Sequence, residues 1–147
     1  MLVKEIFETI IFPNLKDYVE KESLYKPNVT KNTPQTSKIF PIVTAILLPY
    51  ERNYNNLNYG EITYNFGIEI NVYAQDLTVN GEKLSKKTIC NEVTNKVLEF
   101  FENNYHVSIR VELDIKNIDS NVHRDHIRIT GKLDTKGGLN NLVIYPR

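Results

Sequence analysis

The densest group of chemically capable side chains in this 147-residue sequence is His-Arg-Asp-His at positions 123–126. Imidazole is the commonest metal ligand among side chains, and it can also act as a general base. On a β-strand, however, residues three apart point to opposite faces, so the rings of His123 and His126 are expected to diverge. The third histidine, His106, and the single cysteine, Cys90, belong to other segments. The sequence therefore predicts no metal site and no cofactor.

Asp125 is expected to share a strand face with His123, but no serine or cysteine pattern accompanies them, so a nucleophilic triad is not predicted. Glu112 and Asp114 are expected to be same-face neighbours on another strand. Cross-strand ion pairs on a solvated face explain such carboxylates more simply than acid–base catalysis, which needs a pocket that separates their pKa values. Cys90 is expected in the core, where free cysteine is readily buried. We expect no catalytic residues.

Composition narrows the class of protein. Eighteen basic side chains balance eighteen acidic ones, so the chain lacks the broad positive field of a dedicated nucleic-acid-binding domain. A hydrophobic fraction of 41% predicts one globular domain over residues 1–147. One cysteine excludes an internal disulfide, and the longest apolar run, near 39–49, is about half of the roughly 20 residues that a membrane helix needs.

Hydrophobic periodicity gives the order of the elements that must position these residues. The sequence predicts a helix at 3–20, a long loop at 21–38, a strand at 39–48, a hairpin tip at 49–60, a strand at 61–74, a helix at 85–103, strands at 107–116 and 122–134, and a short strand at 142–145. Pro13 is expected to kink or divide the first helix. Ser85 is expected to cap the second helix, and Asn80-Gly81 predicts a tight turn.

The strands predict the layers of the fold. Residues 61–74 alternate between apolar and polar types, as do 107–116 and 122–134, so helices should cover only one side of the sheet. In the strand at 39–48, the residues that face either side of the sheet are apolar. This pattern predicts burial on both faces, by its own chain or by a neighbouring subunit. The predicted fold is therefore α+β, with a largely antiparallel sheet of 4–5 strands and two helices packed on one face.

Candidate interaction residues lie in a loop and on a strand. Tyr50, Tyr54 and Tyr59 lie close together in a polar segment, where aromatic residues are typical of an interface, and Arg124 and Arg128 point outward from a strand. The loops at 21–38 and 49–60 are expected to be mobile in a free subunit and to become ordered on assembly.

Four segments carry a resemblance to a known family. They are Phe40-Pro41-Ile42-Val43, the strand from Phe66 to Asp76, the helix that begins at Ser85, and Asn121-Val122-His123-Arg124 leading into Ile127–Asp134. In layout the whole chain resembles the tail terminator, or tail completion, proteins of long-tailed bacteriophages and phage-derived tail particles. The resemblance transfers no active-site residue.

This resemblance implies a homo-oligomeric, hexameric ring at the head-proximal end of the virion tail. Such a ring contacts the tail tube protein and the head or neck connector proteins, lets DNA pass without specific binding, and contacts no membrane. Three alternatives stay open. They are a head-completion or connector protein of the same virion, a small hydrolase or nuclease that uses Asp114, His123, Asp125 or His126, and a host-directed binding module.

Overall fold

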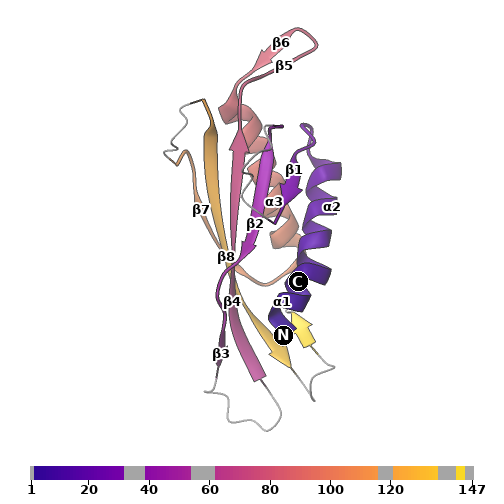
Figure 1. The fold of residues 1–147 in the computed structure, drawn as a ribbon, viewed down its shortest axis with the longest axis vertical. Coiled ribbons are helices and arrows are strands. Elements are labelled where there is room, and N and C mark those ends of the chain that lie inside the picture. Colours follow the sequence, from indigo (N-terminus) through magenta and orange to yellow (C-terminus); the bar gives the residue numbers. More distant parts are fainter. Residues whose placement is uncertain (1, 32–38, 54–61, 116–120, 136–141, 145–147) are drawn as a thin grey trace.

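The computed structural model describes residues 2–31, 39–53, 62–115, 121–135 and 142–144. A mainly antiparallel sheet forms one layer, and two helical segments form the other, both on the same side of the sheet (Figure 1). The fold class predicted from the sequence is therefore confirmed.

The sheet is built around two long strands, β4 (Ile62–Ala74) and β8 (His123–Thr135), which pair antiparallel over their full length. The strand order is β1-β2-β4-β8-β7, with β1 at Asn28–Thr30, β2 at Ile42–Leu47 and β7 at Ser108–Glu112. Two short strands, β3 (Glu51–Asn53) and β9 (Leu142–Ile144), add to β4 and β8 respectively. Only the β1–β2 pair is parallel among these pairings.

The first helical segment runs without a break through α1 (Leu2–Ile6), a π-helical turn η1 (Phe7–Ile11) and α2 (Phe12–Glu22). The amide of Phe12 donates to the carbonyl of Phe7, five residues back. Pro13 lies at the beginning of α2, within this continuous segment, so it has no N–H for the turn before it and its ring crowds that turn. The irregular turn at residues 7–11 lies in the turn that precedes the proline, where the expected disturbance by Pro13 falls.

Three predicted boundaries are corrected. The supposed loop at 21–38 contains the end of α2 and strand β1, and residues 32–38 lie outside the described part. The supposed tip at 49–60 contains β3, and residues 54–60 likewise fall outside that part. The strand expected at 107–116 ends at Glu112, because Asp114 adopts a φ of 54°, in the left-handed region that ends a strand.

The second helix, α3 (Lys86–Asn104), begins as expected. The hydroxyl of Ser85 accepts a hydrogen bond from the amide of Thr88 at 3.2 Å. Just before it, β5 (Leu77–Val79) and β6 (Glu82–Leu84) form a hairpin that projects beyond the end of the sheet (Figure 1). Asn80 and Gly81 both have positive φ in its turn, which confirms the predicted turn.

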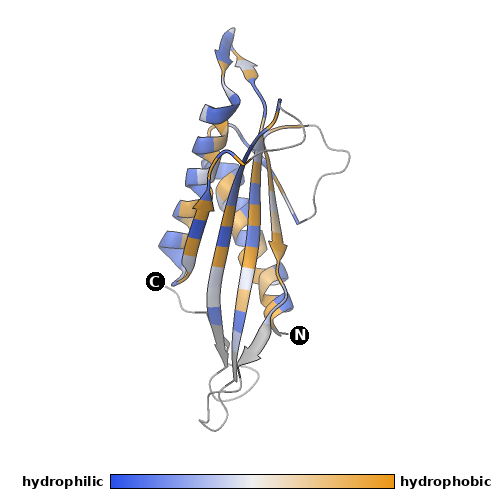
Figure 2. Ribbon diagram, turned by 90° about the vertical axis from the view of Figure 1, so that its left-hand side faces the viewer, coloured by the Kyte–Doolittle hydropathy of each residue, from blue (hydrophilic) through white to orange (hydrophobic). Residues whose placement is uncertain are grey.

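The core lies between the helices and the sheet, and hydrophobic and hydrophilic residues alternate along the long strands (Figure 2). The inner side chains of β2, such as Val43 and Ala45, join this core. Ile42 and Thr44 point to the other face, which we call the outer face, and are also buried within one copy of the chain. The prediction of burial on both faces is confirmed for this half of β2, and it needs no neighbouring subunit.

Candidate functional site

A buried polar cluster lies where β8 begins, between the sheet and α3. His123 and Asp125 are two residues apart on β8, so both face the helices, as the alternation predicts. Asp125 is only 1% exposed, and its Oδ1 lies 3.1 Å from His123 Nε2. A buried carboxylate needs such partners, because an unpaired charge away from water is strongly unfavourable.

Two further groups complete the hydrogen bonding of Asp125. The hydroxyl of Thr94 on α3 donates to Oδ2 at 2.9 Å, and the backbone amide of Asp114 donates to Oδ1 at 3.0 Å. The mostly exposed carboxylate of Asp114 also lies 3.4 Å from His123 Nδ1. The cluster therefore fastens α3 and the segment after β7 to the start of β8.

Cys90, also on α3, lies against the same cluster. Its Sγ donates to the carbonyl of Val72 at 3.4 Å. Burial, and then the negative charge of Asp125, raise the pKa of the thiol far above its ordinary value. The expectation that Cys90 is a core residue is confirmed.

The ligand atoms of Cys90, His123 and Asp125 all lie within 4.8 Å of one another. Sulfur, imidazole nitrogen and carboxylate oxygen are all donors that Zn²⁺ accepts. In this arrangement, however, each of the three side chains already has a hydrogen-bond partner within the chain. The geometry therefore favours a structural hydrogen-bond network over a metal centre.

The expectation that no cysteine accompanies the histidines is thus wrong, whereas the expected divergence of the two histidines is confirmed. His126 points to the outer face, where its Nε2 lies 2.5 Å from Glu69 Oε1. Asp114 does not lie beside Glu112 on a strand, because the backbone turns after Glu112. Glu112 lies on the outer face opposite His126 and has Arg110 of its own strand at 4.0 Å.

The outer face carries the two candidate interaction arginines. Arg124 is half-buried. Its Nε and Nη2 donate to Asn71 Oδ1 at 2.9 and 2.7 Å, and its guanidinium lies 5.9 Å from the ring centre of Tyr73. Arg128 is exposed, with Arg110 directly opposite it on β7 and Glu69 directly opposite it on β4. Arg124 is thus held in place by its own sheet, whereas Arg128 is open to a partner.

Beside Arg128 the outer face is hollowed. A depression of about 680 Å³ is lined on one side by Leu48 and Pro49 and on the other by His106, Arg128 and Lys132. Gly67 lies between them, and a Cβ there would lie 3.2 Å from Leu48 Cδ1, so the absence of a side chain keeps the depression open. No carboxylate lines it among the described residues.

The predicted tyrosine cluster is only partly described. Tyr50 is half-buried and packs edge-on against Tyr64 of β4, with ring centres 6.2 Å apart, so it belongs to the margin of the core. Tyr54 and Tyr59 lie outside the described residues.

The sequence matches no protein-family model and no curated protein. Among the described helices, none is both long enough and apolar enough to cross a membrane.

Proposed function

We propose that this chain is a structural subunit of a bacteriophage tail, a tail terminator that forms a ring on the finished tail tube. In that role it stops polymerisation of the tube and provides the surface to which the head or neck is joined. The proposal starts from the resemblance of the sequence to that family. The order of helix, hairpin, helix and hairpin supports it, because the same layout carries the resemblance.

The observation that carries the proposal is the concentration of arginine on the outer face. The chain has five arginines, and three of them, Arg110, Arg124 and Arg128, lie on this one face of β7 and β8. Arginine is enriched at protein interfaces because its planar head pairs with carboxylates and stacks on aromatic rings. The helix layer covers only the opposite face, so this face, and Arg128 in particular, stays open to a partner protein.

The buried cluster supports a structural role for the residues that an enzyme would use. His123, Asp125 and Cys90 are nearly inaccessible to solvent, and their hydrogen bonds join three segments of the same chain. Substrate would have to displace these bonds to reach them. The cluster therefore supports stabilisation of the subunit rather than catalysis.

Electron microscopy of the purified chain, alone and mixed with isolated tail tubes, tests the proposal. A ring seated on the end of the tube is the expected result. Binding to isolated portal or capsid but not to tubes would favour a head-completion or connector protein. Hydrolase or nuclease activity that is lost on changing Asp114, His123, Asp125 or His126 to alanine would favour an enzyme.

A further inference from the structure

The outermost strands of the main sheet are protected against pairing with another chain. An exposed edge presents unpaired backbone N–H and C=O groups, and proteins block such edges with charged side chains or with a covering element. The edge of β1 is blocked by α2, because Lys16 Nζ donates to the carbonyl of Val29 at 2.8 Å and the amide of Val29 donates to Glu20 Oε2 at 3.3 Å. The edge of β7 carries the charges of Arg110 and Glu112. Both ends of the order β1-β2-β4-β8-β7 are therefore protected.

The second half of β2 has an edge without either kind of protection. Strand β1 pairs with β2 only as far as Thr44, so Ala45–Leu47 lie beyond its end. The amide of Leu48 donates to the carbonyl of Gly67 on β4 at 2.8 Å. Because the backbone groups of successive residues in a strand point to opposite sides, the N–H and C=O of Leu47 point away from β4. This edge is uncharged, and no described strand pairs with it on the side away from β4.

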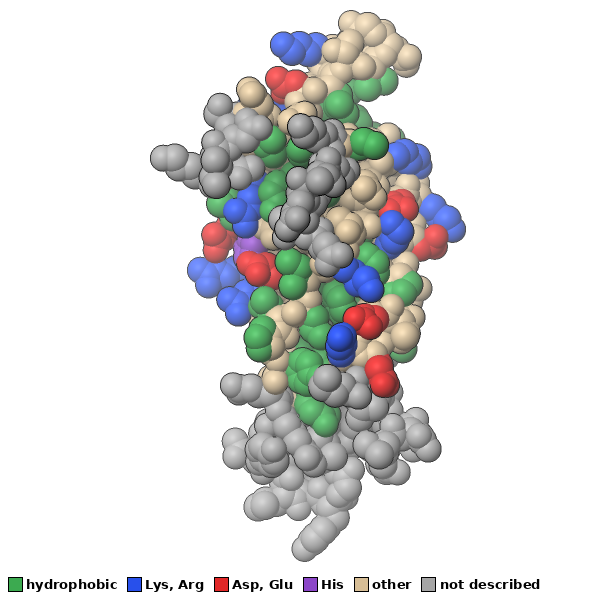
Figure 3. Space-filling view, viewed as in Figure 1, with side chains coloured by type: hydrophobic (Ala, Val, Ile, Leu, Met, Phe, Trp, Pro, Cys, Tyr) green, Lys and Arg blue, Asp and Glu red, His purple; other side chains and the backbone are tan. Residues whose placement is uncertain are grey.

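A groove of about 530 Å³ opens beside this edge. Residues Ala45–Leu48 line it from β2, and Phe7 lines it from the π-helical turn. The charged side chains of its lining are Lys4, Glu8 and Lys31. Figure 3 shows hydrophobic side chains at the surface between the sheet and the first helical segment, with charged side chains at their margin. The groove thus has an open backbone edge and apolar contacts for side chains, the two features that bind an added strand.

The projecting hairpin offers an uncharged edge of the same length. Strands β5 and β6 form a two-stranded sheet of their own, and an isolated hairpin of this kind is only marginally stable in water. Leu77 and Leu84 at its base pack against the core, whereas Val79 near the turn is 44% exposed. β6 carries Glu82 and Lys83, but β5 consists of leucine, threonine and valine. The edge of β5 and the open edge of β2 are therefore both uncharged and three residues long.

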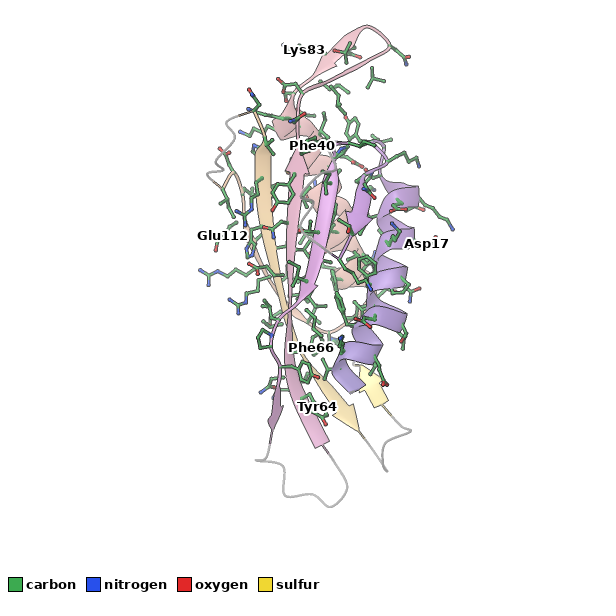
Figure 4. All side chains as sticks on the ribbon, viewed as in Figure 1. Asp17, Phe40, Tyr64, Phe66, Lys83 and Glu112 are labelled. Atoms are coloured by element: carbon green, nitrogen blue, oxygen red, sulfur yellow. The ribbon has the colours of Figure 1, made fainter. Side chains whose placement is uncertain are left out.

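We propose that β5 of one copy adds to the open edge of β2 in the next copy, so that each hairpin lies in its neighbour's groove; this inference rests on the proposed function. Figure 4 labels Lys83 on the hairpin and, toward the other end of the molecule, Phe66. Phe66 lines a small cavity together with Phe7 and Leu47 of the groove. A hairpin therefore reaches the groove of another copy rather than its own. A contact between two different patches is the kind that closes into a ring.

Hydrophobicity and charge select a second copy as the occupant of the groove. Two uncharged edges can pair without placing like charges opposite each other across the new ladder. Val79 is exposed in the free subunit and would gain apolar contacts in the groove. Glu82 lies directly opposite Val79 and shares its face of the hairpin, whereas Lys83 points to the other face. Because the groove has two lysines and one glutamate in its lining, the carboxylate of Glu82 would lie beside an excess of basic groups.

The first test changes the hairpin and measures the mass of the assembled species by light scattering. Val79→Lys places a charge on the face that should enter the groove, so association should weaken by about tenfold, which corresponds to about 1.4 kcal/mol. Thr78→Lys is the matched control, because it adds the same charge to the opposite face of β5 and should leave association unchanged. Circular dichroism verifies that both variants fold.

The second test concerns the backbone of β2. Leu47→Pro removes the N–H that should bond to the added strand, and it removes no bond to β4, because that N–H points away from β4. Leu47→Ala is the control, because it shortens the same side chain and keeps the N–H. Association should be about tenfold weaker in Leu47→Pro than in Leu47→Ala. In the wild-type chain, amide exchange at Leu47 should be fast in dilute monomer and should slow on assembly.

Normal association of Val79→Lys would overturn the proposal, as would a Leu47 amide that is already protected in the monomer, because its bond would then lie within one chain. Tail length is scored separately. Rings that depend on Val79 and on the Leu47 amide but leave tail length uncontrolled contradict the proposed function alone. Normal rings and normal tails from Val79→Lys contradict the contact alone.

Discussion

Arg110 on β7 and Arg128 on β8 lie directly opposite each other, so two like charges occupy one cross-strand pair of the sheet. Such pairs are unfavourable by roughly 0.2–1 kcal/mol relative to neutral ones. The neighbouring pair on the same face, Glu112 opposite His126, has no such repulsion. On the other side of β8, Arg128 lies directly opposite Glu69 of β4, so it has one like charge and one opposite charge across the sheet.

Arg128→Thr should therefore change the stability of the isolated subunit little while weakening its assembly. Threonine suits a β-strand and removes the repulsion from Arg110, but it also removes the attraction of Glu69 across β4, so the free energy of unfolding should change by less than about 1 kcal/mol. Urea denaturation of the monomer measures the first effect, and light scattering measures the second. Lys132→Thr on the same strand is the matched control, because its partner across β4 is the neutral Asn65. A markedly lower free energy of unfolding in Arg128→Thr would show that the charge of Arg128 stabilises the subunit.

The second prediction concerns the buried pair of His123 and Asp125. Asp125→Ala should destabilise the subunit by about 3–5 kcal/mol, because it leaves the His123 ring, the Thr94 hydroxyl and the amide of Asp114 without their acceptor. A double-mutant cycle with His123→Ala should give a coupling of about 0.5–3 kcal/mol. His126→Ala, at the partly exposed pair with Glu69, should cost no more than about 1 kcal/mol. Equal losses of unfolding free energy in His123→Ala and His126→Ala would contradict this account.

The third prediction concerns the thiol of Cys90. Burial raises its pKa in the folded chain, so the native state keeps a proton that the unfolded chain loses. This contribution to stability is complete below the unfolded value of about 8.5 and declines as the pH rises above it. Iodoacetamide should react slowly with the native chain at pH 8 and readily in denaturant. In Cys90→Ala the decline of stability above that pH should be smaller; rapid native alkylation would mean that the thiol is accessible.

The fourth prediction concerns the segment at 49–60. Replacing Tyr54 and Tyr59 by serine should leave the thermal unfolding of the monomer unchanged but weaken ring formation, if these side chains lie between subunits as expected from the sequence. Amide exchange at 54–60 should slow on assembly. Tyr50→Ser is the contrasting variant, because Tyr50 packs against Tyr64 and should lower stability itself. Unchanged rings and unchanged exchange would make this segment an ordinary surface connection.

Alternation of apolar and polar residues made much of the sheet predictable. When only one face of a strand is covered, every second residue is apolar, and this pattern shows which residues face the core. Residues 62–74 and 123–135 form strands close to the predicted limits. Local residue preferences likewise predicted the N-cap at Ser85 and the turn at Asn80-Gly81. Pro13 predicted an irregularity in the first helix, but the sequence did not show that it takes the form of a π-helical turn at 7–11 within a continuous segment.

The buried cluster could be predicted only in part. His123 and Asp125 share a face through their spacing, but Cys90 is 33 residues away from His123 and joins them only because α3 crosses the start of β8. Asp114 joins them because the backbone leaves the strand after Glu112. Both contacts depend on tertiary packing, which short-range sequence patterns do not predict. An apolar helix stripe that contains Cys90 and Thr94 one turn apart was the available signal for polar groups facing the sheet.

Tail length in a phage whose gene for this chain is deleted tests the central claim most directly. Electron micrographs of lysates should show overlong tails without heads, and supplying the wild-type chain should restore tails of uniform length joined to heads. Uniform, head-joined tails in the absence of the chain would contradict the proposal that it terminates the tail tube.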